Sequence, residues 1–229
     1  MAVDFATFLT TAPWILDSKL PILIRGRHGV GKSQVVYQIA DHRTLPVVER
    51  RASQMTEGDL LGLPDTADTE INGRKATTWN APDWLVVACT QPVLLFLDEV
   101  DRATPEVRQG LFELTDSRKI NGWHLHADTL VIAAVNGGEH GAQYQVGEMD
   151  PAELDRWTVF DVEPSIEDWL KWADGRIAGI VWDFVNQNHV HLEHHGEFEP
   201  NKVYPSRRSW DRFNTTAQSA GVFDEGGDL

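Results

Sequence analysis

The chain has 229 residues, 41% of them hydrophobic, which suits one large domain with a buried core, alone or with a small appendage. A formal net charge of −15 opposes non-specific binding to nucleic acid, since such binding needs lysine and arginine gathered on one face. One cysteine leaves no disulfide framework, and because we find neither a signal peptide nor an apolar run long enough to span a bilayer, we expect a protein of the reducing cytoplasm.

The first expected elements frame a glycine-rich loop. Residues 1–19 have the apolar spacing of a helix. We expect its buried side to hold Phe5, Phe8, Leu9 and Trp14. An apolar strand is expected over 20–25 and a helix over 33–42, and the sequence GRHGVGKS at 26–33 joins them. A strand, a glycine-rich loop ending in Lys-Ser and a helix form the arrangement that holds the phosphates of a nucleoside triphosphate.

Each residue type in this loop has a chemical reason to be there. Gly26 and Gly31 let the backbone turn tightly, so that successive N–H groups point at an anion. The Lys32 ammonium is expected on the β- and γ-phosphates, and the Ser33 hydroxyl is an expected ligand of Mg²⁺. His28 stands at a variable position of the motif and is expected to face solvent or the nucleotide's edge, not to catalyse. The expected nucleotide contacts of the loop are Gly26, His28, Gly29, Val30, Gly31, Lys32, Ser33 and Gln34.

The next segment predicts a strand, a short helix and a hairpin. Residues 45–49 are rich in valine and read as a strand, and 56–63 as a helix that ends at a glycine. The polar stretch 64–80 contains Asn72-Gly73, which predicts the turn of an inserted β-hairpin.

A second decisive stretch, PVLLFLDEV at 92–100, follows an expected helix at 82–89 and fits a strand buried on both faces of a parallel sheet. It ends in two carboxylates, Asp98 and Glu99. Ligands of open α/β sheets sit at the carboxyl ends of strands, so we expect both acids beside the glycine-rich loop. Asp98 would hold Mg²⁺, directly or through water, and Glu99 would orient and deprotonate the attacking water. The alternative is that both cap the next helix or lie in solvent.

A third buried strand, at 129–135, ends at Asn136. It follows an expected helix at 104–118 and a hairpin at 119–126. An amide in this place can hydrogen-bond the attacking water or the γ-phosphate, which makes Asn136 a catalytic candidate. Alternatively, Asn136 only starts a turn with the two glycines that follow it.

The chain changes character near residue 164. Before it, we expect a short helix at 150–157 and a last strand at 158–162. Beyond it, the segments with helical patterns are 165–173, 177–187 and 206–217, and 188–204 is polar and irregular. We therefore divide the chain into an α/β core at 1–164, a small helical unit at 165–220 and a flexible acidic tail at 221–229.

Seven segments resemble one family, in its order. They are GRHGVGKS at 26–33, SQMTEGDLLGLP at 53–64, WNAPDWLV at 79–86, LLFLDEVDRATPEV at 94–107, LVIAAVN at 130–136, MDPAELDRW at 149–157 and YPSRRSWDR at 204–212. In these residues the chain is similar to the AAA+ ATPases, and further to their MoxR-type branch, the group with dynein-related AAA domains that includes the CbbQ/NorQ and gas-vesicle N proteins. The resemblance implies a P-loop AAA+ fold: a three-layer α/β sandwich with a parallel sheet and a small C-terminal helical lid. The expected hairpin at 64–80 matches the helix-2 insert of this branch.

The resemblance also implies roles for two arginines. Arg156, in LDRW, matches the arginine finger, which reaches the γ-phosphate of a neighbouring subunit and neutralises charge that develops in phosphoryl transfer. The alternative for Arg156 is a local ion pair with Asp155 or a backbone contact. Arg208, in PSRRSW, matches the lid arginine called sensor 2. Arg207 stands beside it, and the sequence leaves open which of the two points inward.

By this resemblance the chain is a Mg²⁺-dependent ATPase that binds ATP, forms a ring, expected to be a hexamer, and remodels a protein in the manner of a chaperone. Many relatives act with a von Willebrand-type domain, and since we see none in this sequence, a separate client or partner chain is expected. Two other classes stay open. One is an ATPase subunit of a nucleic-acid-processing or defence complex, although the acidic charge speaks against direct contact with nucleic acid. The other is an assembly scaffold that ATP holds together without hydrolysis.

The histidine run at 189–195 and Arg102 each allow a functional and a structural interpretation. The run HVHLEHH at 189–195, with Glu197 nearby, contains zinc-ligand types, but it is polar and outside the expected sheet, so we interpret it as solvated surface. Arg102 either contacts a neighbour's nucleotide or pairs with Asp101 at the start of a helix.

Overall fold

Five parallel strands form the central sheet, in the order β11-β1-β10-β7-β2. They are β1 (Ile22–Arg25), β2 (Val47–Arg51), β7 (Leu94–Asp98), β10 (Leu130–Val135) and β11 (Thr158–Asp161). This computed structural model describes residues 2–65, 69–136, 149–194, 196, 199 and 201–223. The observed sheet confirms the α/β fold with a parallel sheet that the apolar runs predict.

The register of the sheet brings the ends of three strands to one edge. All of β10 and the first four residues of β7 are buried, which is why both strands are continuous apolar runs. β10 pairs with β7 up to Ala134↔Asp98 and with β1 up to Arg25↔Val135. The carboxyl ends of β1, β7 and β10 therefore lie together, where ligands bind in such sheets.

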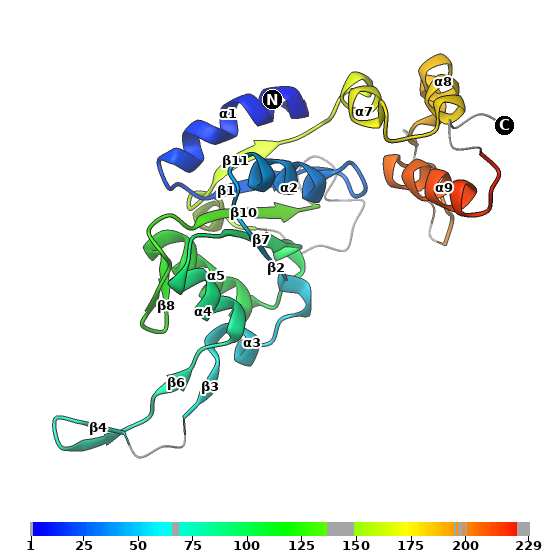
Figure 1. Cartoon of the computed structure of the whole chain (residues 1–229). Helices are drawn as coiled ribbons and strands as arrows, with labels where there is room; N and C mark the ends of the chain where they lie inside the picture. Colours follow the sequence, from blue (N-terminus) through cyan, green and yellow to red (C-terminus); the bar gives the residue numbers. More distant parts are fainter. Residues whose placement is uncertain are drawn as a thin grey trace.

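Helices cover both faces of the sheet (Figure 1). The helices on one face are α1 (Phe5–Asp17) and α2 (Lys32–His42). Those on the other face are α3 (Glu57–Leu61), α4 (Asp83–Thr90) and α5 (Pro105–Ser117). Successive residues of β7 point to opposite faces, so that Phe96 packs in the hydrophobic cluster with α1 and α2, while Leu95 packs in the cluster with α3, α4 and α5.

Local signals decide where two helices begin. Thr104 caps α5 by accepting a hydrogen bond from the N–H of Val107, and a proline takes the first helical position. Asp150 caps α6 (Pro151–Leu154) in the same way, with its side chain bonded to the N–H of Glu153. Both starts agree with the prediction.

One prediction about α1 is wrong. Trp14 is 74% exposed, and the buried residues of this helix are Phe8, Ala12 and Leu16. Residues four apart on a helix share a face, whereas Trp14 lies two positions from both Ala12 and Leu16 and points away from that face. The expected positions Phe5 and Leu9 are only partly buried against the same core.

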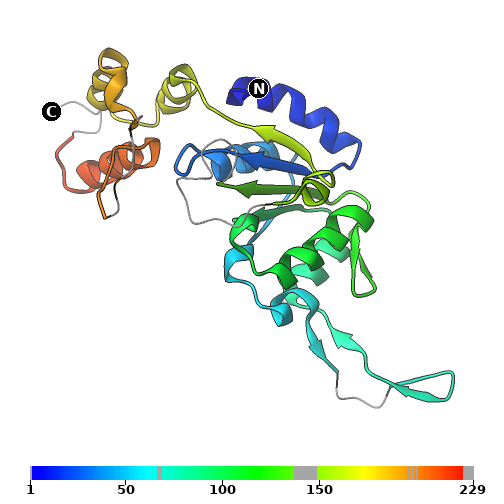
Figure 2. The same cartoon turned by 180° about the vertical axis from the view of Figure 1, so that it is seen from behind.

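An antiparallel arm, residues 63–65 and 69–80, projects from the core (Figures 1 and 2). Its base is β3 (Leu63–Pro64) paired with β6 (Trp79–Asn80), and its tip is β4 (Thr69–Ile71) paired with β5 (Arg74–Ala76). Asn72 and Gly73 form the turn between β4 and β5 with φ of 53° and 73°, as an Asn-Gly pair predicts. The predicted hairpin at 119–126 is also observed, with β8 (Lys119–Ile120) paired with β9 (Trp123–His124).

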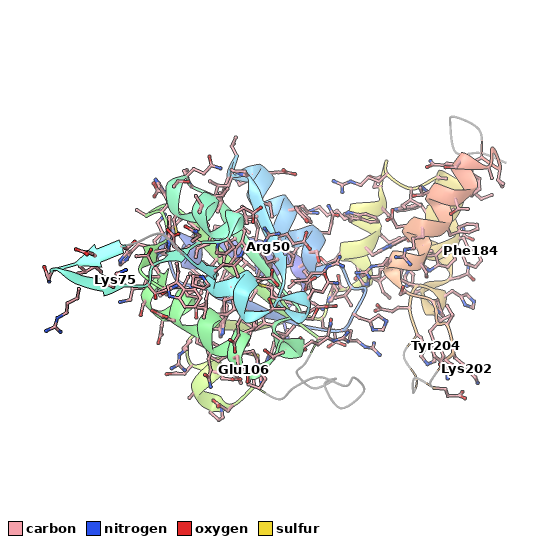
Figure 3. All side chains as sticks on the ribbon, turned by 90° about the horizontal axis from the view of Figure 1, so that it is seen from below. Arg50, Lys75, Glu106, Phe184, Lys202 and Tyr204 are labelled. Atoms are coloured by element: carbon pink, nitrogen blue, oxygen red, sulfur yellow. The ribbon has the colours of Figure 1, made fainter. Side chains whose placement is uncertain are left out.

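A third hydrophobic cluster lies in the C-terminal helices α7 (Ile166–Ala173), α8 (Gly179–Gln187) and α9 (Arg207–Ser219). We call these helices, with the 3₁₀ turn η4 (His189–His191) between α8 and α9, the lid. Lys75 on the arm and Phe184 on the lid lie at opposite ends of the molecule (Figure 3). Most of the expected tail, 221–229, is outside the described residues. Within the described part of the chain, no helix combines the length and the apolarity that a membrane crossing needs.

Candidate nucleotide-binding site

A cavity of about 550 Å³ lies at the carboxyl edge of the sheet, and residues of α1, α2, α7 and α9 line it. The predicted site residues that line it are His28, Gly29, Val30, Gly31, Lys32, Ser33, Gln34, Asp98, Glu99, Asn136 and Arg208. These residues come from four separate stretches of sequence, and the fold brings them together around one space. The volume is in the range of small-molecule sites.

The glycine-rich loop is open toward this cavity. Gly26 does not line the cavity but supports the loop: a Cβ there would lie 2.7 Å from the Val162 carbonyl oxygen, so only glycine fits. Gly29 and Gly31 have φ of 74° and 108°, in the left-handed region that glycine adopts without strain. α2 begins at Lys32 without a side-chain cap among the described residues, which leaves the N–H groups of its first turn available to an anion.

Lys32 is buried at the centre of the site, with 8% of its surface exposed. Its Nζ donates hydrogen bonds to the Gly26 oxygen at 2.9 Å, the Arg27 oxygen at 2.9 Å and Asn136 Oδ1 at 2.8 Å. Burial lowers the pKa of the Lys32 ammonium to about 8, and the nearby carboxylates oppose that shift. A cation held in a low-dielectric site attracts an anionic ligand strongly.

The two acids at the end of β7, Asp98 and Glu99, also line the cavity, and neither side chain caps the 3₁₀ turn or the helix that follows. Asp98 Oδ1 accepts the N–H of Glu99 at 3.0 Å, and burial raises the pKa of Asp98. Glu99 has a left-handed φ of 56°, and its Oε2 accepts a hydrogen bond from Ser53 Oγ at 2.5 Å. Both carboxylates therefore lie at the same cavity as the glycine-rich loop.

Asn136 links this site to the buried carboxylate of Asp101, for which the sequence predicts no role in the site. The Asn136 N–H donates to Asp101 Oδ2 at 3.0 Å, and Asp101 lies in the 3₁₀ turn η2 (Val100–Arg102) that follows the two acids. Asp101 is 3% exposed, and its Oδ1 has no hydrogen-bond partner among the described residues. Ser53, in the 3₁₀ turn η1 (Ala52–Gln54), is the second residue that the sequence reading did not identify.

The two neighbouring arginines of α9 have different surroundings. Arg208 lines the cavity, and its positive charge contributes to the lowered pKa values of His28 and Lys32, for which burial is the main cause. Arg207 also lines the cavity, but it is only 5% exposed and donates to the backbone oxygens of Pro164 and Ser165 and to the Glu193 carboxylate. Both arginines therefore lie at the cavity, and the guanidinium of Arg207 is held by bonds within the protein.

Part of the cavity wall is aromatic and apolar and is formed by residues of α1 and α7. These residues are Phe5, Ala6, Leu9, Trp169 and Trp172, and the charged side chains of Asp168, Lys171 and Arg176 also line the cavity. The indole N–H groups of Trp169 and Trp172 are buried and find no hydrogen-bond partner in the described part of the chain. A flat ring that carries acceptor atoms, such as a nucleobase, has the chemistry to pack against this wall.

The sequence profile of the AAA domain (dynein-related subfamily) matches residues 21–157, which is more than half of the chain. The chain belongs to this family. The matched range of the AAA domain includes the glycine-rich loop, Asp98, Glu99 and Asn136. A sequence search among curated proteins finds no match.

Solved structures share the fold of this AAA domain at low sequence identity. A candidate ATPase from Cytophaga hutchinsonii is 18% identical with a TM-score of 0.53, over 76% of this chain and 51% of that one. Hsp104 in a closed state with ATPγS and FITC-casein is 18% identical with a TM-score of 0.54, over 83% of this chain and 38% of that one. The Hsp104–ADP complex of S. cerevisiae is 18% identical with a TM-score of 0.51, over 81% and 29%. This AAA domain thus spans about half, or less, of these structures.

Arg156 lies apart from the cavity of its own chain. It is not among the lining residues, and its Nε is 3.2 Å from Asp116 Oδ2. The guanidinium also donates to the Ala152 oxygen and lies over the ring of Phe112, 5.5 Å from its centroid. The local ion pair of Arg156 is therefore real, but its partner is Asp116 and not Asp155.

Two minor possibilities from the sequence concern Arg102 and the histidine run at 189–195. Arg102 lies 4.0 Å from Glu99, close enough for an ion pair across one turn. The described residues contain no group of three or more histidine, cysteine, aspartate or glutamate residues that could hold a metal ion. His195 of that histidine run is outside the described residues.

Proposed function

We propose that this AAA domain is a Mg²⁺-dependent ATPase of the MoxR type. The observation that carries the proposal is the meeting of Lys32, Asp98, Glu99 and Asn136 in one cavity above the glycine-rich loop. Backbone N–H groups and a buried ammonium suit a triphosphate, and a carboxylate beside them suits the activation of water. The family and the fold support the same reading.

The donor set in this cavity suits Mg²⁺. The Ser33 hydroxyl and the Asp98 carboxylate both line it and offer the hard oxygen ligands that this ion prefers. Burial raises the pKa of Asp98, so a cation held there would favour its ionised form. When bound, the ion would neutralise charge on the phosphate oxygens.

The chain's own residues would then divide the work of hydrolysis. Lys32 would neutralise the β- and γ-phosphates, and Arg208 would add a second positive charge from the lid. Glu99 would accept the proton of the attacking water, while Asn136 would hold that water or the γ-phosphate by its amide.

We infer further that the protein works as a ring, a hexamer by the pattern of its family. Arg156 is not at its own cavity and remains 34% exposed, as an arginine that serves a neighbouring subunit would be. One heterologous contact, repeated around a closed ring, supplies one such arginine to each nucleotide. Hydrolysis would change the contacts of the lid with its neighbour and thereby remodel a client or a separate partner chain.

Two substitutions test the ATPase assignment. We expect Lys32→Ala to lose ATP binding, because it removes the buried ammonium, and Glu99→Gln to bind ATP but not to turn it over. Binding is measured with a fluorescent ATP analogue and turnover by phosphate release. Lys75→Ala and Glu106→Gln are matched controls, since both residues (labelled in Figure 3) are exposed and neither lines the cavity.

The proposal is wrong if Lys32→Ala binds ATP as tightly as the parent, or if Glu99→Gln releases phosphate at the parental rate. A parent protein that binds ATP and releases no phosphate would instead be a nucleotide-held scaffold, and that result also overturns the ATPase assignment.

A further inference from the structure

Arg207, the first residue of α9, is the most deeply buried arginine among the described residues, with 5% of it exposed. A guanidinium stays charged at any physiological pH, and burying it is costly unless every donor finds a partner. Arg207 belongs to the lid and also lines the cavity, so the contacts that satisfy its guanidinium bear on the geometry of the site.

The contacts of Arg207 join three segments of the chain. One terminal nitrogen donates to the Pro164 oxygen at 2.6 Å, and the other donates to the Ser165 oxygen at 2.8 Å. Nε lies 3.2 Å from Oε2 of Glu193, whose side chain is itself only 19% exposed. Pro164 and Ser165 are the residues through which the chain passes from β11 to the lid, so a single side chain ties α9 to that junction.

Arg207 and Arg208 both line the cavity, and Ser206 before them contacts the glycine-rich loop. Ser206, the N-cap of α9, rests on the glycine-rich loop, since a Cβ at Gly29 would lie 3.6 Å from the Ser206 Cβ. Arg208 lines the cavity close enough for its charge to act on Lys32. The first turn of α9 thus meets the loop on one side and the junction on the other.

We propose that Arg207 is a positioning residue: its bonds to Pro164, Ser165 and Glu193 fix the first turn of α9 so that Arg208 stays over the terminal phosphate. This inference rests on the proposed function, because it assigns a lid arginine to a bound triphosphate. The planar guanidinium can bridge two carbonyls and a carboxylate at once, and no shorter side chain spans that distance. Without Arg207 the helix start loses its tie to the junction, and Arg208 loses its fixed direction.

The experiment compares the affinities of the 229-residue chain for ATPγS and for ADP, both with Mg²⁺, in four forms: parent, Arg207→Ala, Arg208→Ala and the double variant. Arg208→Ala is expected to weaken ATPγS binding about tenfold more than ADP binding, since a charge-assisted bond to the terminal phosphate is lost. Arg207→Ala should also weaken ATPγS binding more than ADP binding, by about threefold to tenfold. The double variant should be no weaker than Arg208→Ala alone, because Arg207 acts through Arg208.

Arg212→Ala is the control, because Arg212 lies exposed on the same helix and outside the cavity lining. Glu193→Gln is the second variant if Arg207→Ala does not fold: it should cause a smaller selective loss that disappears in the Arg208→Ala background. The inference is overturned if Arg207→Ala weakens ATPγS and ADP equally, if the two arginine effects add, or if Arg207→Ala leaves ATPγS binding unchanged. Failure of the parent to bind either nucleotide would overturn the proposed function itself. The experiment therefore distinguishes failure of the inference about Arg207 from failure of the proposed function.

Discussion

At the scale of single residues, Lys32 is bonded entirely to protein oxygens. Its three acceptors are two backbone carbonyls of the glycine-rich loop and the Asn136 amide, all of them neutral. A phosphate adds a direct Coulomb attraction to the ammonium that these neutral acceptors lack, so it can replace them as partners. Asn136 therefore holds the ammonium in place without competing with the ligand through charge.

The neutrality of Asn136 can be tested by adding a charge. In Asn136→Asp, a carboxylate would replace the amide oxygen that lies 2.8 Å from Lys32 Nζ, and it would both pair with the ammonium and repel phosphate. We expect ATPγS binding to weaken about tenfold or more, against less than about threefold for Asn136→Ala. Titration of a fluorescent ATPγS analogue measures both. Equal affinities of the two variants would contradict this account.

A second residue-scale prediction concerns pH. The Tyr37 hydroxyl donates to the Glu49 carboxylate, and this bond raises the pKa of Tyr37 from 10.0 to about 12. A raised pKa stabilises the folded protein below the pKa of the unfolded chain, so the contribution is complete below about pH 10 and is lost as pH rises through about 12. Because the pair is partly exposed, the contribution is of the order of 1 kcal/mol.

The measurement is urea unfolding of the parent and of Tyr37→Phe between pH 8 and pH 11. The difference in unfolding free energy between them should be constant up to about pH 10 and shrink above it. A difference that stays constant to pH 11, or that grows, would show that the hydrogen bond to Glu49 does not set the titration of Tyr37.

At the scale of elements, structure with a local cause could be predicted from the sequence. The apolar runs of β7 and β10 predict buried parallel strands, and Thr104 predicts the start of α5 through its own hydrogen bond to the backbone. The convergence of Lys32 with Asp98 was predictable too, because parallel strands end at the same edge of a sheet.

Contacts between segments that are far apart in the sequence could not be predicted from these local signals. Ser53 lies 46 residues before Glu99, and Asp101 lies 35 residues before Asn136, so no spacing rule joins either pair. Only the position of Asp101, three residues after a strand that ends at the site, hinted at a role. The exposure of Trp14 was misjudged because apolar spacing alone does not say which of two helix faces the sheet covers.

The arm is the element that the fold needs least. Ile71 is 57% exposed and Leu63 is 68% exposed, and no described residue of the arm belongs to any of the three hydrophobic clusters. Since Pro64 pairs with Trp79, an Asn-Gly turn can replace residues 65–78. We expect this deletion to shift Tm by less than about 3 °C and to leave ATPγS affinity unchanged, measured by calorimetry and by titration.

Gly62→Ala gives the opposite expectation at the base of the same arm. A Cβ at Gly62 would lie 2.0 Å from the Asn80 oxygen, and the residue has φ of 88°, so the backbone must shift. This substitution should lower Tm more than the removal of the whole arm. If the deletion lowers Tm more than Gly62→Ala does, the arm supports the core, and the claim that the fold does not depend on the arm is wrong.

At the scale of the whole molecule, the isolated chain carries an arginine that its own site does not use. Arg156 pairs with Asp116 at 3.2 Å, with side-chain exposures of 34% and 55%. Exposed ion pairs contribute about 0–1 kcal/mol, so this pair can be exchanged for a phosphate of a neighbouring subunit at little cost. The ion pair with Asp116 thus leaves Arg156 able to act at the nucleotide site of a neighbouring subunit.

Mixing experiments test that action. We expect Arg156→Ala to abolish phosphate release while retaining ATP binding, and Lys32→Ala to abolish both. A mixed ring places an intact Arg156 from the Lys32→Ala subunit beside an intact nucleotide site of the Arg156→Ala subunit, so mixing should restore part of the turnover. Arg74→Ala, which changes an exposed arginine on the arm, should keep the parental rate. Native mass spectrometry shows whether mixed rings form; if they form and no turnover returns, Arg156 acts within its own chain and the proposed ring geometry fails.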